Sequence, residues 1–248
     1  AQNKQFTLED LNFGGNNFHN MIPEYRNLTW WGDQLVRRNP EDCKLVDKSN
    51  GKETMLFTAD ELNKWAGTNE DNKVRNLGYV QFPYADKSLV LITAKNERML
   101  IDFKKKKTIW RQKREKEQAA EWNAKSKAVA YVKGDNLYVT DAEGRTKQLT
   151  TDGSREIVYG QAVHRNEFNC NGGLFWSADG MKVAFYRMDQ TMVADYPQVN
   201  TFEREATYEP DKSPMAGMTS HKVTVGVYDL NTGKTVYLKA GDPTDRYF

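Results

Sequence analysis

The stretch that decides the fold is AVAYVKGDNLYVTDAEGRTKQLT, which occupies residues 128–150. Its first apolar run, Ala128–Val132, alternates with period two and ends at the turn residues 134–136. The next run, Leu137–Thr140, ends at a second turn, Asp141–Gly144, which also contains glycine. Short alternating runs bounded by such turns are typical of antiparallel strands joined by tight hairpins.

The same pattern returns later in the chain. Val183–Tyr186 follows the turn Ser177–Gly180. Val223–Tyr228 leads through the turn Asp229–Gly233 into Thr235–Leu238. Strand-like periodicity therefore dominates the sequence and predicts an all-β fold.

The strands group into repeated units that each begin at an aromatic anchor. The anchors are Trp30, Phe82, Trp122 and Trp176, at spacings of 52, 40 and 54 residues. A period of about 40–50 residues with four strands per unit is the signature of β-propeller blades, which stack around a channel. We therefore expect a partial propeller of four-stranded antiparallel blades, with an N-terminal segment at about residues 1–29 and blades at about residues 30–248.

Two capping boxes predict short helices. Thr7–Asp10 starts one near the N-terminus, and Thr58–Glu61 starts another that runs through Trp65 and stops at Gly67. The stretch from Asp195 to Ser220 has no regular period and interrupts the fourth blade between its second and third strands. An insertion of this length is either a functional or interface element or a solvated loop.

Composition excludes several classes of protein. The 248 residues are 38% hydrophobic and include 6 Trp, 12 Tyr and 11 Phe, which excludes wholesale disorder. Apolar runs are too short for a membrane span. A net charge of +2 does not by itself argue for a nucleic-acid or membrane partner. Two cysteines, Cys43 and Cys170, cannot build a four-thiolate zinc site, and their pairing is left open.

Most motif-like features have a structural explanation. Ser177 lacks both flanking glycines of a nucleophile elbow and belongs to a blade hairpin. The three histidines lie far apart, and no phosphate or dinucleotide loop is present, so we expect neither a metal nor a cofactor. The block Lys104–Lys107 with residues 111–116 is a nucleic-acid patch or a solvated hairpin tip, and the balanced charge favours the latter.

The polar run His164–Phe168 is less easily explained. It lies between the apolar strand Ile157–Tyr159 and the apolar anchor Leu174–Trp176. Polar groups so close to strands need partners or solvent, so this run is either a surface loop or a binding site.

The region around this run resembles the propeller domain of dipeptidyl peptidase IV. The region looks most similar to bacterial members of that family, which include prolyl tripeptidyl aminopeptidases. The resemblance is clear over about residues 120–248. Over the first 120 residues it is limited to the general pattern of propeller blades. It is carried by Val158–Phe168, Leu174–Gly180, Ala184–Asp189, the Pro214–Gly217 segment and the blade link Leu149–Tyr159.

The resemblance implies a function for the whole protein. In that family an eight-bladed propeller caps a C-terminal α/β-hydrolase domain with a Ser, Asp and His triad, and this domain is absent from the present chain. We therefore expect the substrate-gating propeller of a serine exopeptidase that cleaves after proline and releases di- or tripeptides. The chain alone is expected to be inactive. The alternative is a non-catalytic propeller that acts as a protein-interaction scaffold.

The resemblance also implies site residues. Dipeptidyl members carry a Glu-Glu pair that grips the free amino terminus of the substrate, and this chain has Asn166 and Glu167 there, preceded by Arg165. An ungapped count back from Trp176 places Asn166, not Glu167, at the second glutamate position. The substrate-binding candidates are therefore Glu167, Asn166 and Arg165. Dipeptidyl members also have an arginine that helps hold the substrate carbonyl. The Arg111 region is the nearest candidate for it in this chain, and we do not assign that role to it.

The ends of the chain complete these expectations. The sequence opens at Ala1 without an initiator Met, as after removal of an export signal or in a trimmed recombinant chain. The last residues resemble a loop that enters another strand, which suggests a fragment. We expect an extracytoplasmic location, in the periplasm or at the cell surface. The expected partners are peptides with free amino termini and the hydrolase domain, without nucleic acid or a membrane span, and a homodimer is left open.

Overall fold

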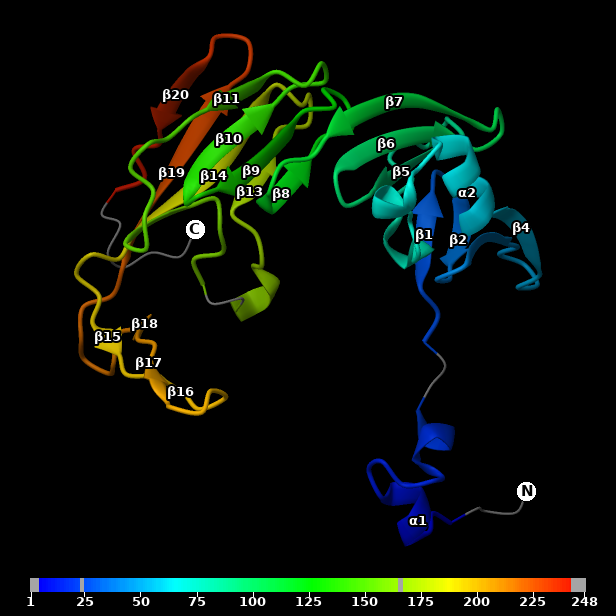
Figure 1. Ribbon diagram of the computed structural model, residues 1–248, viewed down its shortest axis with the longest axis horizontal. Coiled ribbons are helices and arrows are strands. Elements are labelled where there is room, and N and C mark those ends of the chain that lie inside the picture. The colour runs from blue at the N-terminus through cyan, green and yellow to red at the C-terminus, as the bar shows by residue number, and fades with distance from the viewer. Residues whose placement is uncertain (1–4, 23–24, 165–166, 242–248) are drawn as a thin grey trace. The chain divides into compact units, whose positions relative to one another are not determined.

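Both helices lie where their capping boxes predict them. The computed structural model describes residues 5–22, 25–164 and 167–241 (Figure 1). In α1 (Leu8–Leu11) the Thr7 hydroxyl accepts from the Asp10 amide at 3.2 Å, and Thr7 N–H donates back to the Asp10 carboxylate at 2.9 Å. Helix α2 (Ala59–Ala66) has the same arrangement at Thr58 and ends at Gly67 with φ 61°. The other helical elements in the described ranges are short 3-10 turns: η1 (Phe18–Met21), η2 (Glu70–Asn72), η3 (Leu77–Tyr79) and η4 (Glu167–Asn169).

The first sheet is a four-stranded antiparallel meander. One face buries Trp31, Val36 and Phe57, whereas Trp30, the anchor of the sequence repeat, is 59% exposed. The buried anchor of this unit is therefore the next residue, Trp31, because neighbouring residues of a strand point to opposite faces. The strands are β1 (Leu28–Trp31), β2 (Gln34–Arg38), β3 (Asp42–Val46) and β4 (Glu53–Thr58).

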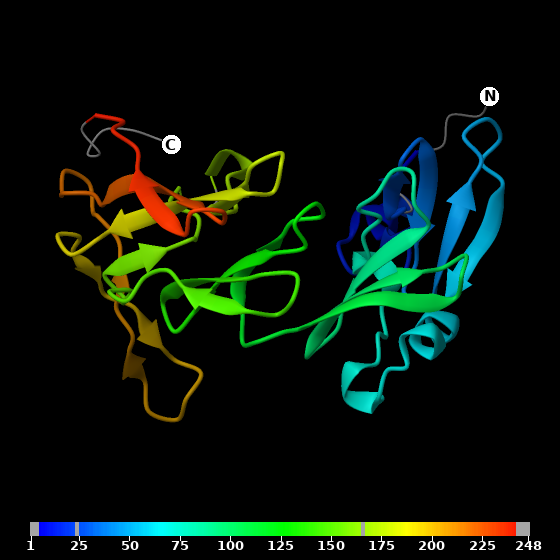
Figure 2. The same cartoon turned by 90° about the horizontal axis from the view of Figure 1, so that it is seen from above.

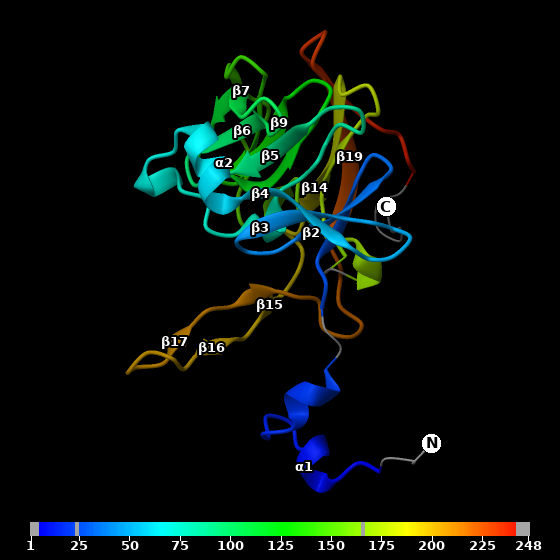
Figure 3. The same cartoon turned by 90° about the vertical axis from the view of Figure 1, so that its right-hand side faces the viewer.

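The second sheet shares an aromatic core with the first. The Phe103 ring lies 5.0 Å from Trp31 and 5.5 Å from Phe57, and the Phe82 ring lies 6.3 Å from both. Residue 82 follows a single bridge between Gln81 and Leu91, which occupies the place of a first strand. Lys104–Lys107 are exposed where the chain turns from the second strand of this sheet into the third, as expected of a hairpin tip. The strands are β5 (Leu89–Thr93), β6 (Glu97–Asp102) and β7 (Lys107–Lys113), and α2 contacts β4 and β6 (Figure 3).

The chain divides into two compact units, residues 1–111 and 112–248. In the second unit, Trp122 and Trp176 end the first strands of successive sheets. Trp122 pairs with Val129 and Trp176 with Val183, so the two anchors are equivalent, as the repeat predicts. The third sheet contains β8 (Gln118–Trp122), β9 (Val129–Lys133), β10 (Asn136–Thr140) and β11 (Thr146–Gln148). The fourth contains β12 (Ile157–Tyr159), β13 (Leu174–Trp176), β14 (Lys182–Asp189), β19 (Lys222–Asp229) and β20 (Lys234–Tyr237).

An apolar core lies between the third and fourth sheets. Val132, Leu137, Val183 and Phe185 are completely buried in it. The Trp176 indole N–H also donates to the Glu121 carbonyl at 2.8 Å, which ties the first strands of the two sheets together. The all-β prediction is confirmed.

The insertion in the fourth sheet forms an arm rather than an irregular loop. It lies between β14 and β19, as the sequence predicts, and contains two short antiparallel pairs (Figure 2). Its base is fixed by Arg155, which donates to the Asp195 carboxylate and to the Pro210 carbonyl, both at 2.7 Å. The sequence missed these pairs because each strand has only two residues. They are β15 (Asp195–Tyr196) with β18 (Asp211–Lys212), and β16 (Val199–Asn200) with β17 (Thr207–Tyr208).

Candidate functional site

The first strand of the fourth sheet is interrupted by a long loop. Strand β12 pairs with the end of β14, where Tyr159 faces Arg187. Strand β13 pairs with the same edge of β14, where Leu174 faces Phe185. The two short strands are therefore one edge strand into which residues 160–173 are inserted. We call residues 160–173 the edge loop; Figure 1 shows it leaving the sheet beside β13, with η4 as a yellow-green turn.

Both ends of the edge loop meet at Tyr186. The Gly160 N–H donates to the Tyr186 carbonyl at 2.9 Å, and the Tyr186 N–H donates to the Gly173 carbonyl at 3.0 Å. The ends also touch each other, because a Cβ atom at position 173 would lie 2.3–2.5 Å from backbone atoms of Gln161. Only glycine fits such a contact, so the sequence fixes where the loop leaves and rejoins the strand.

Glu167 lies on the described outer part of this loop. Its N–H donates to the His164 carbonyl at 2.9 Å, and its carbonyl accepts from the Cys170 N–H at 2.9 Å. The side chain is exposed, and among the described residues no hydrogen bond or ion pair is formed by its carboxylate. The carboxylate is therefore available to a ligand.

The backbone after Glu167 is strained. Phe168 has φ 54° and Asn169 has φ 59°, in the left-handed region that non-glycine residues rarely adopt. Such conformations cost free energy and persist where the surrounding structure over-determines them, often at functional sites. The strained residue Phe168 directly follows Glu167, and its side chain is 83% exposed. The other two candidates, Arg165 and Asn166, lie outside the described residues.

Buried aromatic groups support the base of the loop. His164 is 8% exposed, and its ring lies 6.1 Å from the Tyr186 ring at an interplanar angle of 78°. The sequence grouped His164 with a polar run that was either a surface loop or a binding site, and the structure packs this residue against the sheet. Burial also raises the pKa of the Tyr186 hydroxyl.

A polar network fixes β12 beside the loop. The Tyr159 hydroxyl donates to the Asp152 carboxylate at 2.8 Å and accepts from Arg187 Nε at 3.1 Å. Burial and the hydrogen bond to Asp152 both raise the Tyr159 pKa. The same hydrogen bond, helped by Arg187, lowers the pKa of Asp152. The sequence did not reveal this network, because its three members lie on separate segments.

A polar cavity of about 280 Å³ lies at the base of the edge loop. Residues 160–162 and 171–173 form one side of it, and Ala119 and Glu121 of β8 form the other. Glu121 was not among the candidates named from the sequence. The one feature of the sequence that could have indicated its location is the anchor Trp122. Glu121 directly precedes this anchor and therefore lies on the first strand of the blade, which is an edge strand.

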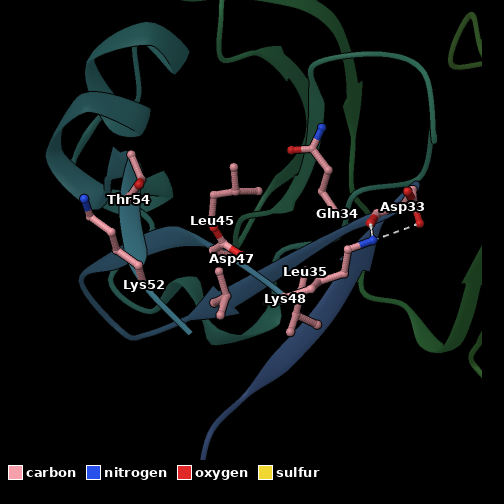
Figure 4. Close-up of a pocket in the computed structure, with 9 residues that line it drawn as sticks. Asp33, Gln34, Leu35, Leu45, Asp47, Lys48, Lys52 and Thr54 are labelled. Atoms are coloured by element: carbon pink, nitrogen blue, oxygen red, sulfur yellow. Dashed lines mark hydrogen bonds and ion pairs between the residues drawn. The ribbon is translucent and has the colours of Figure 1, made fainter. Parts of the chain in front are cut away.

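The first unit has a larger surface cavity of about 420 Å³ between its hairpin turns (Figure 4). Its charges are largely satisfied within the protein. Lys48 Nζ lies 3.1 Å from Asp33 Oδ1, and Asp47 accepts from Ser49 N–H and Oγ at 2.8 and 2.6 Å. Of the charged side chains that line this cavity, Lys52 is the one for which the described residues provide no ion pair or hydrogen bond.

The remaining motifs have structural roles. Ser177 Oγ donates to Asp179 at 2.5 Å and accepts from the Lys182 N–H at 2.9 Å, which confirms a hairpin turn. Arg111 pairs with Glu97 at 3.0 Å. Cys43 and Cys170 are both free thiols. Within the described ranges, no three metal-ligating side chains gather into a cluster, and no helix has the length and apolar character needed to cross a bilayer.

Comparison with known proteins gives consistent relatives. A family profile described as the dipeptidyl peptidase IV (DPP IV) N-terminal region matches residues 75–248. A protein of Verticillium alfalfae assigned as dipeptidyl-aminopeptidase B is 33% identical over 135 aligned positions, and the match covers 48% of this chain and 15% of that protein. A protein of Pyrenophora tritici-repentis with the same assignment is 25% identical over 260 residues, covering 96% of this chain and 28% of the relative.

Solved structures agree over nearly the whole chain. A Bacteroides ovatus protein assigned as a dipeptidyl aminopeptidase IV is 39% identical with a TM-score of 0.80, over 99% of this chain and 34% of that protein. Dipeptidyl peptidase 4 of Porphyromonas gingivalis is 16% identical with a TM-score of 0.66, over 98% of this chain and 36% of that protein. The chain thus spans about a third of these structures. The likeness confirms the partial propeller, whose blades are the four antiparallel sheets.

Proposed function

From the premise that this chain belongs to the family of the dipeptidyl peptidase IV N-terminal region, we propose that it is the substrate-recognising propeller of a serine exopeptidase. The whole enzyme cleaves after proline, releases di- or tripeptides, and acts in the periplasm or at the cell surface. Its catalytic serine belongs to an α/β-hydrolase domain outside this chain, so the chain alone turns over no substrate.

The observation that carries the proposal is the carboxylate of Glu167. It stands exposed and unpaired, within the described residues, on a strained loop inserted into the first strand of a blade. The first strand of a propeller blade lies next to the central channel, so a loop inserted there projects toward the path of a substrate.

The chemistry suits an exopeptidase. Such an enzyme must distinguish the amino terminus of a peptide from its interior. A carboxylate forms charge-assisted hydrogen bonds with an α-ammonium group and none with an acylated amino terminus. Glu167 therefore selects for a free amino terminus, with Asn166 and Arg165 as neighbours in the same loop.

The test uses the full-length enzyme with Glu167→Gln. Losing one charge-assisted hydrogen bond costs about 1.5–3 kcal/mol, so kcat/KM for a free-amine Xaa-Pro substrate falls about 10- to 100-fold. The acetylated form of the same substrate is unaffected. Glu205→Gln, which removes an exposed carboxylate on the arm, is the matched control and leaves both rates unchanged.

An equal loss for both substrates would show that Glu167 has no role in recognising the amino terminus. A selective loss with Asn166→Asp instead of Glu167→Gln would shift the assignment to residue 166. Absence of peptide hydrolysis by the wild-type enzyme would reject the proposed activity itself.

A further inference from the structure

A β-bulge in the third blade changes the direction of an edge strand beside the edge loop. In β8, Gln118 pairs with Val132, but the next regular pair is Glu121 with Ala130. Two residues of β8 therefore stand opposite one residue of β9, and Ala119 takes a φ of 48°. Bulges of this kind redirect a side chain and are frequent next to binding sites.

The bulge places Glu121 at the polar end of an apolar core. Its partner Ala130 is completely buried in the core between the third and fourth blades. Paired residues in an antiparallel sheet share a face, so the Glu121 side chain starts from the core-facing side of β8. The cavity of about 280 Å³ lies at this point, between Glu121 and the two ends of the edge loop.

The carboxylate of Glu121 brings uncompensated negative charge to the cavity. Among the described residues no ion pair or hydrogen bond is formed by this carboxylate. The polar side chains that line the cavity with it, Gln161 and Asn171, are neutral. Glu121 is exposed as a residue, but partial burial of its carboxylate raises its pKa. With a single carboxylate, the cavity lacks the ligand set of a metal site.

We propose that this cavity binds the cationic side chain of a lysine or arginine near the amino terminus of a bound peptide, with Glu121 as its ion-pair partner. The inference rests on the proposed function, because that function brings peptides to the inner edges of the blades. Glu121 lies at the base of the edge loop, whereas Glu167 lies on its outer part. The two carboxylates therefore hold two different cations of one peptide, and Glu121 adds a preference for basic residues.

The first experiment measures binding and needs no turnover. Calorimetry on the full-length protein compares two peptides that differ only in a lysine or its uncharged isostere norleucine, placed at each of the first four positions in turn. The wild-type protein prefers lysine at one of these positions, and Glu121→Gln reduces that preference about 10-fold. Glu143→Gln removes an exposed charge on the β10–β11 turn of the same blade and leaves the preference unchanged.

A second variant adds bulk at a residue that lines the cavity, without removing the charge. A Cβ atom at Gly172 has no neighbour within 4 Å, and its backbone is outside the left-handed region, so Gly172→Leu places bulk in open space. It also abolishes the lysine preference while leaving the affinity for the norleucine peptide within about 2-fold. Retention of the preference in Glu121→Gln, or equal losses for both peptides, would overturn the proposal.

The kinetic counterpart separates this proposal from the proposed function. In the active enzyme, Glu121→Gln lowers kcat/KM for the lysine substrate about 10-fold and leaves the norleucine substrate unchanged. Glu167→Gln lowers kcat/KM for both by the same factor. If wild-type enzyme hydrolyses neither substrate, the proposed function fails, and calorimetry alone decides whether Glu121 binds the cation.

Discussion

The contact between the two ends of the edge loop predicts a large difference between neighbouring glycines. In Gly173→Ala the added methyl group would lie 2.3–2.5 Å from the backbone of Gln161, so the two ends must move apart. Overpacking costs about 1–3 kcal/mol. The movement also weakens the hydrogen bonds of Gly160 and Gly173 to Tyr186, each worth about 0.5–1.5 kcal/mol. We expect a loss of about 2–4 kcal/mol in the free energy of unfolding.

Urea denaturation followed by tryptophan fluorescence measures this loss, and a thermal scan should show a decrease in Tm of about 6–15 °C. The control is Gly172→Ala, whose methyl group meets nothing within 4 Å. It should be neutral or stabilising by up to about 1 kcal/mol, because alanine restricts the unfolded chain. Equal stability of the two variants would refute the packing of the loop ends described here.

Two further predictions concern titratable groups. Cys170 is exposed, whereas Cys43 is completely buried and its pKa is raised to about 12, first by burial and then by Asp42. A thiol reagent at pH 8 should therefore label one cysteine in the native chain and the second only in denaturant; rapid native labelling of Cys43 would contradict its burial. The Asp152 pKa is lowered by the Tyr159 hydroxyl and by Arg187, so its stabilising effect is present above its unfolded pKa of about 3.9 and is lost as pH falls through the folded value. Asp152→Asn should destabilise by up to about 1 kcal/mol at pH 7 and by progressively less below pH 4, whereas a difference that stays constant with pH would show that Asp152 acts through packing alone.

The sequence predicted the elements better than their pairing. Capping boxes at Thr7 and Thr58 and the alternating strands depend on neighbours within a few residues, so local patterns were sufficient. The segments Ile157–Tyr159 and Leu174–Trp176 were both recognised as apolar. That they form one interrupted edge strand depends on their register with β14, which no local pattern records.

The candidate site was predicted only in part. Glu167 was named through a family resemblance, and its role remains a prediction, as do those of Arg165 and Asn166. Glu121 was missed because its direction depends on a bulge, and a bulge leaves no clear trace in the sequence QAAEW of β8. The Tyr159, Asp152 and Arg187 network was missed because it joins three segments that become neighbours only after folding.

The shared anchor of the edge loop has an evolutionary consequence. Tyr186 donates to one end of the loop and accepts from the other, so the blade keeps its hydrogen-bond ladder whatever lies between Gly160 and Gly173. Natural variation can lengthen, shorten or rewrite the intervening residues without altering the register of the surrounding sheet. Selection for a stable blade and selection for a new peptide preference can then act on separate residues. A single blade architecture could therefore diversify in specificity while its framework stays constant.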